Sequence, residues 1–125
     1  MSVILGVDHV QLAMPSGREA DAQRFYRDTL GIPEIPKPPH LATRGGAWFE
    51  NAQVKIHLGV EHDFRPARKA HPGLLVANLR DLVRRLRDAG YKVVEDSSTE
   101  EPKHVYVLDP FGNRIELIQV PEANG

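Results

Sequence analysis

The sequence of 125 residues has no cysteine. This excludes disulfides and thiolate ligands, so any metal site in this chain must be built from nitrogen and oxygen donors. A surplus of positive charge is also absent, because 16 Lys and Arg residues are balanced by 17 Asp and Glu residues for a net charge of −1. We therefore expect no nucleic-acid partner, since binding to phosphates requires a basic surface.

Long apolar runs are missing as well. No run approaches the roughly 20 apolar residues that span a membrane. The N-terminal run has no basic segment before it and is interrupted by Asp8 and His9, unlike a signal peptide. We expect a cytoplasmic protein with no membrane partner, and one domain over residues 1–125 that buries its own core.

The first half of the chain shows strand and helix periodicity in a clear order. Residues 7–14 alternate as a half-buried strand does, and residues 18–30 carry apolar side chains at helical spacing before Gly31, which can take a positive φ. Four prolines and no periodicity predict an irregular loop over residues 32–44. Residues 47–50 and 54–59 are then expected to form a hairpin.

The second half repeats this order. A strand is expected over residues 71–76, and Asn78 with Asp81 predicts the start of a helix that runs through Ala89 to Gly90. Strands over residues 91–95, 105–108 and 114–120 follow. The pattern β-α-β-β-β occurs twice, which predicts an α+β fold of paired modules over about residues 5–60 and 70–121.

Alignment of the two halves pairs residues that can bind metal. When residues 50–58 are laid over 109–117, His57 falls on Glu116, 59 positions later. When the two opening strands are aligned, His9 falls on His71, 62 positions later. A strand turns alternate side chains to opposite faces, so each of these residues is expected on the face opposite its apolar neighbours.

These four residues predict one site for a divalent ion of Zn, Ni, Fe, Mn or Co, because imidazole and carboxylate ligands suit those metals. A single histidine on a strand is more often a surface or hydrogen-bonded residue, and it is the repeat-related placement of four that favours a metal. His40, His62 and His104 lack such placement, and we interpret them as surface residues or as residues that support the site.

Three segments resemble the vicinal oxygen chelate superfamily of glyoxalases, bleomycin-resistance proteins and extradiol dioxygenases. They are DHVQL at residues 8–12, FYRDTLG at 25–31 and, most specifically, DPFGNRIEL at 109–117. The resemblance covers nearly the whole chain. It implies paired βαβββ modules forming a curved, partly open mixed sheet with helices on its outer face, commonly in a homodimer.

The resemblance also implies a ligand set. His9, His71 and Glu116 match the two histidines and one carboxylate of extradiol dioxygenases and fosfomycin-resistance enzymes. His57 occupies a position that resembles a glutamate of bacterial glyoxalase I, which both binds metal and moves a proton. In this sequence, Pro72 directly after His71 is a second departure from the glyoxalase pattern. The site is expected either within one chain or between two subunits.

Other residues are candidates for chemistry and substrate binding. Isomerisation requires a base, and His57 and Tyr106 are the candidates. Arg65, Arg68 and Lys69 precede His71 and could attract an anionic substrate, although basic loops are often only solvated surface. Trp48 is either a wall of the pocket or a core residue, with the core favoured.

Four functions follow from these features. A metal-dependent enzyme acting on a small, oxygen-rich molecule through bidentate chelation is favoured, with glyoxalase-like lyase or isomerase chemistry ahead of extradiol dioxygenase chemistry. A metal-free, drug-binding protein of the bleomycin-resistance kind ranks lower because the ligand set is retained. Fosfomycin-type thiol transfer is compatible with the ligands.

Overall fold

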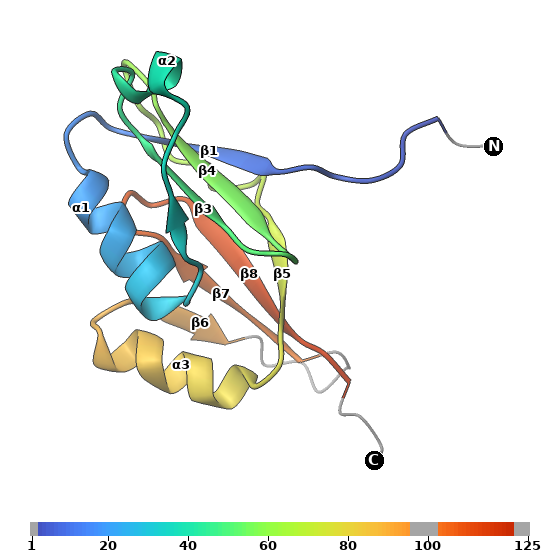
Figure 1. Ribbon diagram of the computed structural model, residues 1–125. Coiled ribbons are helices and arrows are strands. Elements are labelled where there is room, and N and C mark those ends of the chain that lie inside the picture. Colours follow the sequence, from blue (N-terminus) through green and yellow to red (C-terminus); the bar gives the residue numbers. More distant parts are fainter. Residues whose placement is uncertain (1–2, 96–102, 122–125) are drawn as a thin grey trace. The chain divides into compact units, whose positions relative to one another are not determined.

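The computed structural model describes residues 3–95 and 103–121. The chain divides into two compact units, Met1–Phe64 and Arg65–Gly125, and each has its own four-stranded sheet (Figure 1). Among the described residues, the longest helices are too short and too polar to traverse a lipid bilayer.

The first unit forms a mixed sheet with the strand order β1-β4-β3-β2. Its elements are β1 (Val10–Met14), α1 (Glu19–Ala22), η1 (Gln23–Thr29), β2 (Glu34–Ile35), α2 (Pro39–Ala42), β3 (Ala47–Glu50) and β4 (Lys55–Val60). The β1 and β4 strands run parallel, and the other neighbours are antiparallel. A parallel pair needs a crossover, which the helical segment between β1 and β2 begins.

The second unit has the same topology, with the strand order β5-β8-β7-β6. Its elements are β5 (Gly73–Val76), α3 (Leu79–Asp88), β6 (Val93–Glu95), β7 (His104–Leu108) and β8 (Arg114–Gln119). Again the first and last strands pair in parallel and the rest are antiparallel. The predicted duplication and the α+β class are confirmed.

Backbone register confirms the alignment of the two halves. Gln11 pairs with His57 across β1 and β4, and Gly73 pairs with Glu116 across β5 and β8. His9 stands two residues before Gln11, and His71 stands two residues before Gly73. The two candidate pairs therefore occupy equivalent places in their own sheets.

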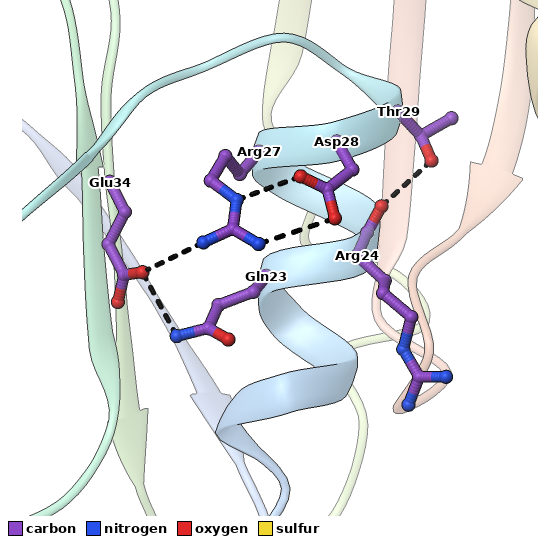
Figure 2. Close-up of polar contacts among 6 residues, drawn as sticks. All are labelled: Gln23, Arg24, Arg27, Asp28, Thr29 and Glu34. Atoms are coloured by element: carbon purple, nitrogen blue, oxygen red, sulfur yellow. Dashed lines mark hydrogen bonds and ion pairs between the residues drawn. The ribbon is translucent and has the colours of Figure 1, made fainter.

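The first helix differs from the expected α-helix. Only its first turn is α-helical, and residues Gln23–Thr29 form a π-helix. The wider turn of a π-helix is seen in the hydrogen bond from Leu30 N to Phe25 O, five residues earlier (2.9 Å). The Thr29 hydroxyl also donates a hydrogen bond to Arg24 O (2.8 Å). Figure 2 shows this bond beside the salt bridges of Arg27. The helix still ends at Gly31, whose φ is +81° as predicted.

The expectation of an irregular loop over residues 32–44 was partly wrong, because this segment contains β2 and α2. Glu34 accepts a hydrogen bond from Gln23 Nε2 (3.0 Å), and Arg27 lies 3.6 Å from the same carboxylate (Figure 2). These contacts hold β2 against the π-helix. Pro39 stands in the first turn of α2, where a missing backbone N–H costs nothing.

Each sheet turns one face to a helix. In the first unit Phe25 and Tyr26 are fully buried, and the Tyr26 ring stacks on Phe49 of β3 at 5.4 Å. In the second unit the Asn78 side chain caps α3 by accepting from Asp81 N, as predicted. The largest fully buried side chains of the two units are Met14, Phe25, Tyr26, Phe49, Ile56, Leu58, Leu86, Val107, Asn113, Ile115 and Leu117.

The opening strands are shorter than predicted. The β1 strand begins at Val10, so residues 3–9 lie before it without regular structure. The β5 strand begins at Gly73, directly after Pro72, which cannot donate a ladder hydrogen bond. His9 and His71 therefore precede their strands by one and two residues.

Candidate metal centre

The first unit gathers three aromatic rings on the sheet face that points away from its apolar core. His57 is in register with Gln11 on one side and Trp48 on the other. Its neighbours Ile56 and Leu58 are buried on the opposite face, as the alternation predicted.

These rings form a stack. The Trp48 and His57 rings are nearly parallel, with centroids 3.9 Å apart and planes 3° apart. The His9 ring lies at 4.3 Å and 20° from His57. This stack leaves His57 only 5% exposed, although it lies on the polar face. Trp48 is half-buried and lies outside the apolar core, so the preference for a core tryptophan was wrong.

Each histidine of the stack has one nitrogen bound to a carboxylate. His57 Nε2 lies 2.6 Å from Glu50 Oε2, and His9 Nδ1 lies 2.9 Å from Asp8 Oδ2. The hydrogen bond from His9, assisted by nearby Lys55, lowers the pKa of Asp8. A carboxylate that fixes one imidazole nitrogen orients the other, an arrangement common in metal-binding histidines.

The second unit brings His71 and Glu116 into direct contact. His71 Nε2 lies 2.9 Å from Glu116 Oε1, and His71 Nδ1 donates to the Lys69 carbonyl at 2.9 Å. Both ring nitrogens thus face oxygen acceptors, which suits the protonated ring. The Lys69 carbonyl, followed by the Glu116 carboxylate, raises the pKa of His71 above its ordinary value.

The spacing of this pair fits adjacent ligands of one ion. Metal–nitrogen and metal–oxygen bonds of about 2 Å place neighbouring ligand atoms about 3 Å apart, close to the 2.9 Å between Nε2 and Oε1. An ion would replace the proton that the pair now shares. The Lys69 carbonyl would continue to orient the ring through Nδ1.

The structure places each pair within its own unit. His9 and His57 belong to the first unit, and His71 and Glu116 belong to the second. Among residues 3–95 and 103–121, no group of three or more histidine and acidic side chains is assembled to hold an ion. Within the described part of the chain, the predicted ligands therefore form two pairs of chemically suitable donors.

Tyr106 lies beside the second pair. It is in register with Glu116, and its ring meets the His71 ring edge-on at 5.6 Å. The Arg114 guanidinium lies over the Tyr106 ring at 3.9 Å, and the His104 ring meets this ring edge-on with the centroids 5.6 Å apart. His104 thus supports Tyr106, and Tyr106 takes the position that Trp48 occupies in the first unit.

The predicted basic loop is exposed, and so are His40 and His62. Arg65, Arg68 and Lys69 are exposed side chains of the segment that leads to His71. Of the three, Lys69 has a described link to the pair, through its backbone carbonyl.

The sequence reasoning missed Glu50 and Arg114. Glu50 lay within the aligned segment 50–58. Its contact with His57 was not predicted, because the two residues lie diagonally across β3 and β4 and are not directly opposite each other. Arg114 lay within the aligned segment 109–117 but was given no role. Its position two residues before Glu116 on β8 was the signal, because residues i and i+2 share a face.

The segment of residues 109–113 is a turn that supports Glu116. Asp109 Oδ1 accepts from the backbone N–H groups of Phe111 (2.9 Å) and Asn113 (2.8 Å), and Asp109 Oδ2 accepts from Asn113 Nδ2 (2.9 Å). Asn113 Oδ1 in turn accepts from Ala67 N (2.9 Å). Gly112 has a φ of +94°, where other residues are strained. This turn fixes both β8 and the segment that leads to His71.

Comparison with known proteins identifies the family. The model of the Glyoxalase/Bleomycin resistance protein/Dioxygenase superfamily matches residues 6–117. A Bacillus anthracis protein assigned to the glyoxalase family is 43% identical, with a TM-score of 0.90 over 97% of this chain and 99% of that one. No curated protein matches the chain.

Two more distant structures show the same fold. The genomically encoded fosfomycin resistance protein FosX from Listeria monocytogenes, solved with Mn(II) and sulfate, is 16% identical with a TM-score of 0.73, covering 94% of this chain and 92% of that one. TnmS3, an antibiotic binding protein from a Streptomyces species, is 21% identical with a TM-score of 0.66, covering 94% and 100%. Because the family model spans most of both units, this chain belongs to the Glyoxalase/Bleomycin resistance protein/Dioxygenase superfamily.

Proposed function

We propose that this chain is a divalent-metal-dependent enzyme that acts on a small, oxygen-rich and anionic substrate, with glyoxalase-like lyase or isomerase chemistry favoured over extradiol oxygenation. The observation that carries the proposal is the His71–Glu116 pair, whose 2.9 Å spacing suits adjacent ligands of one ion. The Mn(II) bound to FosX supports a divalent ion in this family.

We assign the ion to His9, His71 and Glu116, the two-histidine, one-carboxylate set of the family resemblance, with His57 as the fourth candidate ligand that the aligned halves predict. Zn, Ni, Fe, Mn and Co all accept such ligands. When bound, the ion would supply Lewis-acid polarisation of two neighbouring substrate oxygens. Three protein ligands leave open coordination positions, which a bidentate substrate requires.

The remaining candidates would handle protons and charge. His57 and Tyr106 are the proposed bases, and in His57 the atom open for a proton is Nδ1, since Nε2 is bound to Glu50. Arg114, Arg65, Arg68 and Lys69 would attract the anionic part of the substrate. Trp48 would line the site beside His57.

Elemental analysis of protein purified without chelator tests the metal. We expect about one divalent ion per chain in the native protein and almost none in a His71→Ala, Glu116→Ala variant. The matched control is His62→Ala, because His62 is exposed and lies outside both pairs. An equal trace of metal in the native protein and the double variant would overturn the proposal.

A second candidate is metal-free binding of a drug, favoured by the similarity of the fold to the antibiotic binding protein TnmS3 over 94% of this chain. The same elemental analysis distinguishes this candidate from the metal-dependent enzyme. A folded native protein that carries no stoichiometric metal, and whose stability does not respond to added Zn²⁺, would favour this candidate over the enzyme.

We also propose that the chain works as a homodimer. The support is an exposed apolar segment before β1, in which Val3, Leu5 and Val7 are 93%, 97% and 84% exposed. Apolar side chains this exposed and this close together in the chain would gain from burial against another protein surface.

A further inference from the structure

The stacked rings of the first unit restrict which histidines can bind an ion. An imidazole binds metal through a lone pair that lies in the plane of its ring, with the metal about 2 Å from the nitrogen. A single ion bound to two imidazoles must therefore lie close to both ring planes and close to both donor atoms.

His9 and His57 do not meet this condition. Their ring centroids are 4.3 Å apart and their planes differ by only 20°. Planes so nearly parallel and so far apart intersect about 10 Å from the rings, whereas a bound ion lies about 2 Å from its nitrogen. One ion therefore cannot take both residues as ligands in this arrangement.

Two observations identify His57 as the residue that does not bind. Trp48 covers one face of its ring at 3.9 Å and His9 covers the other. Glu50 also holds its Nε2 at 2.6 Å, and the side chain is only 6% exposed. Binding an ion through Nε2 would break the hydrogen bond to Glu50, and turning the ring to present Nδ1 would break the stack.

His9 has the freedom that His57 lacks. Its side chain is 40% exposed, and its one described hydrogen bond engages Nδ1, so no partner among the described residues occupies Nε2. It also takes the repeat position of His71, whose Nε2 faces Glu116. The repeat thus supplies one histidine of the same kind from each unit.

We propose that His57 is not a metal ligand, and that Glu50 is a positioning residue that holds it as a metal-free imidazole with the proton on Nε2. This inference rests on the proposed function, because it assigns the ligands of that site. It separates two residues that the aligned halves treat as equivalent, since Glu116 is assigned to the ion and His57 is not.

The test is ¹⁵N NMR of the histidine rings in the full-length protein, stripped of metal and then titrated with Zn²⁺ alone. We expect the Nε2 signals of His9 and His71 to shift by tens of ppm at one equivalent. The His57 signals should stay within a few ppm, with Nε2 protonated and Nδ1 unprotonated. A His57 nitrogen that shifts as far as His9 Nε2 would overturn the inference while leaving the proposed metal site intact.

Zn²⁺ that shifts none of the three rings would overturn the proposed metal site and this inference with it. Variants of Glu50 separate positioning from folding. Glu50→Gln is expected to mix the two protonation forms of the neutral His57 ring, while the His9 and His71 shifts with Zn²⁺ persist. Glu50→Asp should restore part of the native His57 pattern, which a purely structural role of Glu50 would not predict.

Discussion

The His71 imidazole is held by two oxygen acceptors, and this has a measurable consequence for the metal-free protein. The Lys69 carbonyl, then Glu116, raises the pKa of His71. A histidine whose pKa rises on folding stabilises the fold below its unfolded pKa of about 6.5, and this stabilisation is lost as the pH rises through the folded pKa.

We therefore predict that Glu116→Gln lowers the His71 pKa, measured by NMR after chelation. The variant should also lower the free energy of unfolding more at pH 5.5 than at pH 8.5. Asp88→Asn, at the exposed end of α3, serves as the control. A stability loss that is equal at both pH values would contradict the prediction.

Alternation along the strands predicted the faces of His57 and Glu116, because a period of two follows from backbone geometry alone. The hydrogen-bonding partners could not be predicted in this way. Glu50 reaches His57 diagonally across a hairpin, and Trp48 covers His57 because the two residues are in register. Such contacts depend on strand register and side-chain rotamers, which one sequence does not fix.

At the scale of elements, the turn of residues 109–113 is expected to contribute strongly to stability. Asp109 is 4% exposed and accepts three hydrogen bonds from buried donors of Phe111 and Asn113. Removing the carboxylate removes all three of these hydrogen bonds, and a hydrogen bond to a charged group contributes about 1.5–3 kcal/mol to stability.

Asp109→Ala should therefore reduce the free energy of unfolding by about 3 kcal/mol in urea denaturation. Asp88→Ala, at the exposed end of α3, should change it by less than about 0.5 kcal/mol. A loss below about 1 kcal/mol for Asp109→Ala would show that water or a relaxed turn replaces the carboxylate.

The elements with clear periodicity and caps were predicted well, and the exceptions have local causes. Asn78 and Gly90 delimit the predicted helix because capping and positive φ are encoded by single residues. The π-helix was not predictable, because the spacing of apolar residues does not distinguish it from an α-helix; the bond from Thr29 to Arg24 O accompanies it. Likewise, β2 is a strand because it pairs with β3, and this pairing cannot be predicted from the local sequence of a proline-rich segment.

At the scale of the whole molecule, the duplication was visible in the sequence because both units must position the same kind of residue at the same register. The two halves differ in the segment that precedes the first strand of each. The residues before β1 include Val3 and Leu5, more exposed than the large apolar residues described elsewhere in the chain. A segment of this kind gains most from burial against another protein surface.

We predict that the native protein sediments at twice the 14.0 kDa mass of the chain, and that Val3→Ser with Leu5→Ser shifts it toward monomer. Burying one such side chain contributes about 1.5–3 kcal/mol, and in a symmetric dimer each substitution acts twice. The dissociation constant should therefore rise at least about a hundredfold.

Analytical ultracentrifugation over a concentration series measures this change. Val94→Ser is the matched control, because Val94 is 51% exposed on β6, far along the chain from the opening segment. If the double variant and the control give the same dissociation constant, the N-terminal segment does not form the dimer contact. If the native protein is a monomer throughout the series, the proposed homodimer is wrong.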